Sequence, residues 1–112
     1  MRIFNEQKTI ELTKEQCDLN VGYLKEQKEN NEIIYIYTLY TQKQLLDKEK
    51  QKLEYWFAND YREMFEKCTR RITLGKTLRD GSNPNIKLQE LYAKAETNAN
   101  RINEISILLQ TL

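Results

Sequence analysis

The stretch Ile33–Tyr40, which reads IIYIYTLY, is apolar or aromatic at every position except Thr38. Residues of this kind, β-branched and aromatic, are typical of a β-strand. Side chains alternate along a strand, so one face would carry Tyr35 and Tyr37 and the other Ile34, Ile36 and Tyr40. Neither face is polar enough for open solvent. We therefore expect one face to rest on the helices that follow and the other to contact a second subunit.

Short strands precede this stretch in the sequence. Arg2–Phe4 and Thr9–Leu12 are β-compatible and are separated by a polar turn, which predicts a hairpin. Residues 20–22 form a turn into Tyr23–Lys25, and the Asn-Asn pair at positions 30 and 31 tolerates the positive φ of a tight hairpin. Residues 1–40 are therefore predicted to form a small antiparallel sheet of three or four strands.

A long helix is predicted to follow the sheet. Thr41 can cap it, because the threonine hydroxyl could accept from the free amides of the first turn. Gly75 can end it in the left-handed conformation, and Arg70 and Arg71 lie where the helix dipole favours cations. Between these ends apolar residues recur every three, four or seven positions, at Leu46, Leu53, Phe57, Tyr61, Met64, Cys68 and Ile72.

The segment Gly75–Asn85 is the one long loop and holds the only proline. Asn83 before Pro84 fits a helix N-cap with proline at the first helical position. The second helix has an a/d-like apolar pattern broken only by Asn98, and its members are Leu88, Leu91, Ala95, Ile102, Ile105, Leu109 and Leu112. The fold class predicted is α+β, as a single domain over 1–112. The sheet takes residues 1–40, and a long antiparallel two-helix hairpin takes residues 41–112.

The composition indicates self-association. The 112 residues are 39% hydrophobic and 31% charged, which leaves a monomer little core, so a homodimer or higher homo-oligomer is expected. Trp56 and Phe65 lie off the apolar stripe of their helix and offer a second contact face. The residues predicted at the subunit interface are Tyr35, Tyr37, Tyr40, Trp56 and Phe65. With 18 Lys and Arg against 17 Asp and Glu, the chain lacks the cationic excess of a general DNA or RNA binder.

The chain has no histidine, so it lacks the usual general base and the imidazole metal ligand. It also lacks a P-loop, a GxGxxG and an HExxH motif. We therefore expect no enzymatic activity, no metal site and no cofactor. Cys17 and Cys68 have neither CxxC spacing nor a signal-like leader before them. Free thiols, a cytoplasmic location and no membrane span are the expectation.

Six residues are candidates for binding a small ligand. Arg101 borders the helix seam and could present a bidentate fork to a phosphate, or it could cover apolar surface with its stem. Asn98 could fix the register of helix packing or bind a ligand. Four loop residues offer donors and acceptors beside a helix N-terminus, where amides attract anions, or they are caps and turns. These loop candidates are Arg79, Asp80, Asn83 and Asn85.

Two segments carry a resemblance to known proteins. Gly22–Glu26, which reads GYLKE, and the pair Tyr40-Thr41 at the start of a charged helix resemble small proteins encoded by phages and prophages of Clostridium-like bacteria. Leu39 stands where a proline is common in those proteins. The resemblance covers mainly the first half of the chain and implies a virion-associated or assembly role, because many such genes lie near tail genes.

The overall plan resembles the phage Thoeris anti-defence sponge family. Those proteins have a small sheet followed by two long helices, form oligomers, and sequester cyclic ADP-ribose isomers or cyclic oligonucleotides without hydrolysing them. They grip the ligand between protomers with helix arginines and a loop that carries an aromatic residue and an asparagine. Arg101 and Asn83 or Asn85 would match this pattern, while the loop offers Leu74 and Leu78 and no aromatic residue.

The resemblance implies a phage-encoded anti-defence protein that acts in the infected bacterial cytoplasm, binding a cyclic nucleotide signal at a homo-oligomer interface. The alternative is a tail-associated structural or assembly protein that acts through protein contacts. A third possibility is direct inhibition of a host defence protein through a stable complex.

Overall fold

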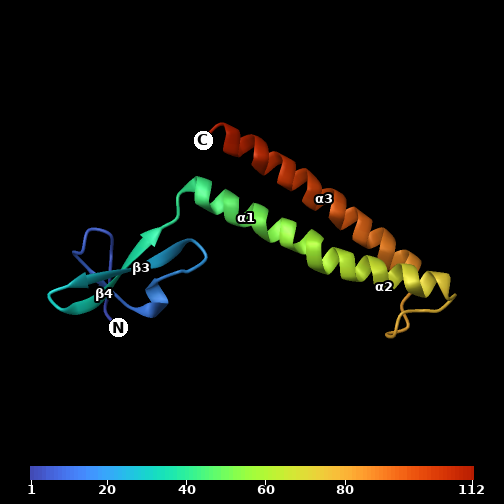
Figure 1. Cartoon of the computed structure of the whole chain (residues 1–112), viewed down its shortest axis with the longest axis horizontal. Coiled ribbons are helices and arrows are strands. Elements are labelled where there is room, and N and C mark those ends of the chain that lie inside the picture. Colours follow the sequence, from blue (N-terminus) through green and yellow to red (C-terminus); the bar gives the residue numbers. More distant parts are fainter. The chain divides into compact units, whose positions relative to one another are not determined.

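A computed structural model describes all 112 residues, and the chain forms two compact units, Met1–Leu45 and Leu46–Leu112. The first unit contains a four-stranded sheet, and the second contains nearly all of the helical structure (Figure 1). Both a sheet and long helices are present, so the α+β class is confirmed.

The sheet consists of β1 (Ile3–Phe4), β2 (Glu11–Leu12), β3 (Gly22–Glu29) and β4 (Glu32–Leu39), in the order β2-β1-β4-β3. β4, the aromatic strand, is one of the two central strands. It pairs with β3 in an antiparallel manner and with β1 in a parallel manner. The expectation of a wholly antiparallel sheet is therefore wrong. After β2 the chain crosses through a short 3₁₀ helix (Lys14–Gln16) to the opposite edge, so the β3–β4 hairpin sets β4 beside β1 in the same direction.

The predicted hairpin turn between β3 and β4 is confirmed. Glu29 pairs with Glu32, and Asn30 and Asn31 between them have φ values of 50° and 62°. A two-residue loop with both central φ values positive matches the twist of the strands it joins. The register of the whole hairpin follows from this turn.

The two faces of β4 differ in burial. Ile34 and Ile36 are buried, whereas Tyr35 and Tyr37 on the opposite face are half-buried. The Tyr37 ring lies over Gly22, and its hydroxyl donates to the Asp18 carbonyl at 2.6 Å. Residues of the sheet unit itself therefore cover part of the β4 face that carries Tyr35 and Tyr37.

The predicted first helix is a continuous run of α1 (Gln42–Trp56), a π-helical turn η2 (Phe57–Tyr61) and α2 (Arg62–Thr73). Thr41 caps it as predicted. The Gln44 amide donates to the Thr41 hydroxyl at 3.2 Å, and the Thr41 amide donates to the Gln44 side chain at 2.9 Å. This reciprocal pair is a capping box.

The first helical run ends at the predicted glycine. Gly75 has φ 65°, its amide donates to the Ile72 carbonyl, and the Lys76 amide donates to the Arg71 carbonyl at 2.9 Å. These two bonds form a Schellman motif, which satisfies carbonyls that have no partner within the helix.

The second long helix, α3 (Pro84–Gln110), begins where the sequence predicts. The Asn83 side chain accepts from the Asn85 amide at 2.8 Å. α3 returns antiparallel beside α2 within the helical unit (Figure 1). Cys68 of α2 and Ile105 of α3 are fully buried, and Leu46 and Leu91 are nearly so. The predicted hairpin and most of its apolar seam are therefore confirmed, but Leu112, which was predicted on the seam, lies beyond the end of α3 and is exposed.

Aromatic residues gather around the π-helical turn. Ring centroids lie 4.9 to 6.4 Å apart along the series Trp56, Phe57, Tyr61, Phe65 and Tyr92. Phe65 thus contacts α3, while Met64 is exposed. The sequence pattern placed Met64 on the packed stripe and Phe65 off it, and the structure reverses the two.

Candidate functional site

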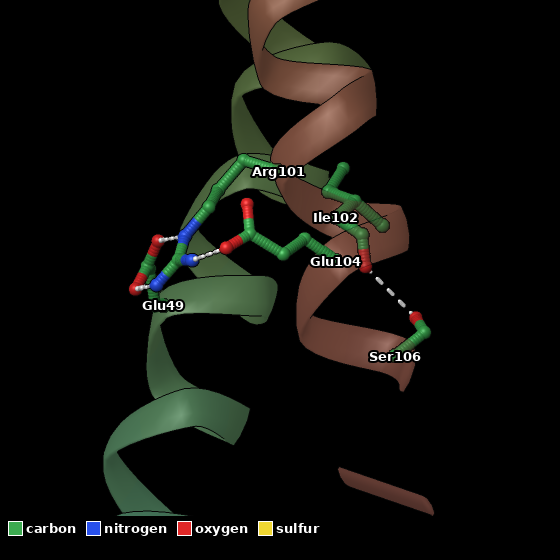
Figure 2. Close-up of polar contacts among 5 residues, drawn as sticks. All are labelled: Glu49, Arg101, Ile102, Glu104 and Ser106. Atoms are coloured by element: carbon green, nitrogen blue, oxygen red, sulfur yellow. Dashed lines mark hydrogen bonds and ion pairs between the residues drawn. The ribbon is translucent and has the colours of Figure 1, made fainter. Parts of the chain in front are cut away.

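Arg101 on α3 uses its guanidinium to bind two carboxylates of its own chain. Nε donates to Glu49 Oε2 at 2.5 Å and Nη2 donates to Glu49 Oε1 at 2.8 Å, a bidentate pair between α3 and α1 (Figure 2). Nη1 lies 3.1 Å from Glu104 Oε1. The Arg101 guanidinium, which the sequence predicts as a possible phosphate ligand, therefore already binds carboxylates within the helical unit.

This pair changes the acidity of both partners. The hydrogen bond from Arg101 holds the pKa of Glu49 below its ordinary value, although partial burial acts in the opposite direction. The same bond raises the pKa of Arg101, which therefore keeps its charge at any ordinary pH. The pair joins α1 to α3 beyond the closely packed α2–α3 region.

The stabilisation from Glu49 is expected to depend on pH. Because the folded pKa lies below the unfolded one, stability from the carboxylate is fully present above the unfolded pKa. It is lost as the pH falls through the folded pKa. Glu49→Gln should therefore lower the urea midpoint at pH 7, and the difference from wild type should shrink below a pH of about 4. A difference that stays constant over this range would contradict the assignment.

Asn98 lies within the apolar seam of α3 and is half-buried, and its side chain makes no hydrogen bond with another residue of the chain. Both interpretations of Asn98, register and ligand, therefore stay predictions.

The predicted loop residues and Arg101 lie far apart within one chain. Asn85 and Arg101 are sixteen residues apart on one uninterrupted helix, a separation of about 24 Å at the α-helical rise. A site that combined both would need residues from different protomers.

Two of the predicted loop residues stabilise the loop and the first turn of α3. Leu78 is buried; its amide donates to the Ser82 carbonyl, and its carbonyl accepts from the Gly81 amide. Asn83 caps α3. Asp80 accepts from the Ser82 amide and hydroxyl, and these bonds lower the pKa of Asp80. The loop is thus an ordered turn; Arg79 is exposed on it, and Asn85 is exposed in the first turn of α3.

Arg79 lines a cleft of about 430 Å³ at the loop end of the helical unit. The other residues that line it are Glu63, Glu66, Lys67, Arg70, Arg71 and Leu74. None of the four cationic side chains makes a hydrogen bond or an ion pair within the chain, whereas Glu66 accepts from Arg62 at 3.3 Å. With four cations and two carboxylates in its lining, the cleft carries a net charge of +2 (4 − 2), and none of the four cations is held in an ion pair.

Lys67, Arg70 and Arg71 are not among the binding candidates predicted from the sequence, where the two arginines are placed only at the helix dipole. A signal was present, because Lys67, Arg70 and Arg71 are spaced three and four positions apart and so share one helical face. Only the loop geometry, however, brings Arg79 to the same cleft.

The predicted interface residues all have neighbours within their own units. Besides Tyr37 and Phe65, already described, Tyr40 packs against Tyr23 with centroids 5.2 Å apart, and Lys94 lies over the Trp56 ring at 5.2 Å. Tyr35 is half-buried. Their contact with a second subunit stays a prediction.

Comparisons of this chain with protein families, with curated proteins and with solved structures gave no match. The helices include none with the length and apolar character that a membrane span requires. No group of three or more potential metal-ligating side chains is present, and both cysteines are buried free thiols.

Proposed function

We propose that this protein is a phage-encoded anti-defence protein that binds and sequesters a cyclic nucleotide immune signal without cleaving it. The ligand would be a cyclic ADP-ribose isomer or a cyclic oligonucleotide. The observation that carries the proposal is the cleft lined by Lys67, Arg70, Arg71 and Arg79, whose charges have no partner in the chain.

The chemistry of the cleft suits a compact ligand with phosphates. Arginine offers a planar fork that binds phosphate through two parallel hydrogen bonds. A volume of about 430 Å³ lies within the range of small-molecule sites. Leu74 adds an apolar wall against which a ribose or base can pack. Arg101 is not expected to bind a phosphate, because its guanidinium already forms ion pairs with Glu49 and Glu104.

Sequestration fits these residues better than cleavage does. The chain has no histidine to act as a general base. Of the two carboxylates in the cleft, Glu66 is held by Arg62. A site that binds without reacting needs only complementary charge and shape.

A binding experiment tests the proposal. Isothermal titration with cyclic ADP-ribose isomers and cyclic dinucleotides should detect at least one ligand. Arg70→Ala combined with Arg79→Ala should weaken binding by about tenfold or more for each arginine removed, as expected for charge-assisted hydrogen bonds. Lys43→Ala with Lys52→Ala is a matched control, because it removes the same charge from exposed positions outside the cleft.

Two results would contradict the proposal. One is the absence of binding by every nucleotide in the panel. The other is equal weakening by the cleft variant and the control, which would indicate general charge attraction only.

A second candidate function is a tail-associated structural or assembly protein. Its support is the exposed apolar end of α3, where Ile107, Leu108 and Leu112 lie open to solvent. Exposed apolar residues that lie close together mark contacts with other proteins. Purification of the protein with phage particles, together with failure to bind nucleotides, would favour this function.

A further inference from the structure

β3 forms one edge of the sheet and is eight residues long, so one side of its backbone has no strand beside it. Such an edge is a template for pairing with another extended chain. In its second half the strand reads Lys25, Glu26, Gln27, Lys28 and Glu29, and all but Gln27 are exposed. Charge pattern and backbone geometry together specify a partner for this edge.

The pairing with β4 determines which backbone groups of β3 face outward. Beyond the strand ends the Tyr40 amide donates to the Val21 carbonyl at 2.9 Å, and across the tight turn Glu29 is opposite Glu32. Hydrogen-bonded and non-bonded pairs alternate in an antiparallel ladder. The odd-numbered residues of β3 therefore bond to β4, and the N–H and C=O groups of Leu24, Glu26 and Lys28 point to the open edge.

We propose that the β3 edge binds the β3 edge of a second copy of this chain, antiparallel and centred on Gln27. In this register Glu26 is opposite the partner's Lys28, and Lys25 is opposite the partner's Glu29. Two-fold symmetry repeats both pairs, so oppositely charged side chains face each other on both faces of the joined sheet. Glu26 and Lys28 also exchange backbone hydrogen bonds with the partner's Lys28 and Glu26.

The neighbouring symmetric registers are worse. Centring on Lys25, Glu26 or Lys28 places that residue opposite its own copy, which sets two like charges together. Like charges directly opposite each other destabilise a sheet, whereas opposite charges stabilise it. Among these registers the charges favour the one centred on Gln27, and the outward backbone groups permit it.

Lysines on an edge strand commonly prevent pairing. Here the charged residues are ordered so that every lysine lies opposite a glutamate when a second copy runs antiparallel with Gln27 facing Gln27. Of the four charged residues, only Glu29 has an ion pair within the chain, an exposed contact with Lys8 at 3.4 Å. The edge therefore repels most strands but matches a second copy of itself. This inference does not depend on the proposed ligand.

Charge reversals at two positions test the pairing in the full-length protein. In a dimer of Glu26→Lys, both pairs between positions 26 and 28 would consist of two lysines. In a dimer of Lys28→Glu, both pairs would consist of two glutamates. We expect each variant alone to dimerise about tenfold or more weakly than wild type by sedimentation equilibrium. An equimolar mixture of the two should form a heterodimer about as strong as the wild-type dimer, because every pair across the edge is then oppositely charged.

Amide exchange gives a second readout. The amides of Glu26 and Lys28 should be protected at high protein concentration and exchange freely on dilution. Circular dichroism of each variant checks that the sheet is folded. A monomeric wild type would overturn the proposal, as would a dimer unaffected by either reversal, or variants whose mixture stays monomeric.

Discussion

Ile105→Ala is expected to lower the free energy of unfolding of the helical unit by about 3 kcal/mol. Ile105 is completely buried on α3. Removing the buried carbons loses their transfer free energy and leaves a cavity that the surrounding helices cannot fully close. Urea unfolding followed by the fluorescence of Trp56 measures the effect, since this single tryptophan lies within the same unit.

Ile107→Ala is the matched control for this change. It removes the same atoms from the same helix two positions away, but Ile107 is 55% exposed. A surface substitution of this kind should change stability by about 0.5 kcal/mol or less. Equal effects at 105 and 107 would show that helix propensity, and not burial, determines the result.

The elements that the sequence predicted well are those with a local physical cause. Thr41, Gly75 and Asn83 mark helix ends because each satisfies backbone groups within a few residues of itself. The Asn30-Asn31 turn is similarly local. Periodic apolar residues then predicted which helix faces pack, since burial follows the helical repeat.

The π-helical turn could have been predicted from spacing. Leu53, Phe57, Tyr61 and Phe65 are each four residues apart. Over twelve residues an ideal α-helix would carry such a stripe about a third of a turn around its axis. The wider π turn between Phe57 and Tyr61 accommodates one extra residue and keeps the aromatic side chains in contact. A strictly α-helical repeat instead places Met64 on the stripe, although this residue is exposed.

Other features depend on residues distant in sequence and were not predictable from local patterns. The parallel pairing of β1 with β4 depends on where the chain crosses after β2. The role of Arg101 depends on Glu49, which lies 52 residues earlier. A single sequence contains no signal that connects such pairs. For the same reason the sequence does not predict the cleft, although Arg79, one of its residues, is a predicted binding candidate.

Gly22→Ala is expected to destabilise the β3–β4 hairpin by about 1 to 3 kcal/mol. A Cβ atom on Gly22 would lie 2.7 Å from three atoms of the Tyr37 side chain, which is too close for non-bonded carbon. The ring cannot simply swing away, because its hydroxyl donates to the Asp18 carbonyl at 2.6 Å. Either this hydrogen bond breaks or the two strands separate locally. Faster exchange of the hairpin amides, measured by NMR, would report the change.

A double-mutant cycle separates this clash from the general cost of replacing glycine in a strand. In a Tyr37→Ala background the space above Gly22 is open, so Gly22→Ala should have little effect there. Tyr37→Phe is an intermediate case, because it keeps the ring and removes only the hydrogen bond that holds it. Gly22→Ala should therefore cost less in the Tyr37→Phe background than in wild type. An equal cost in all three backgrounds would show that Tyr37 does not require glycine at position 22.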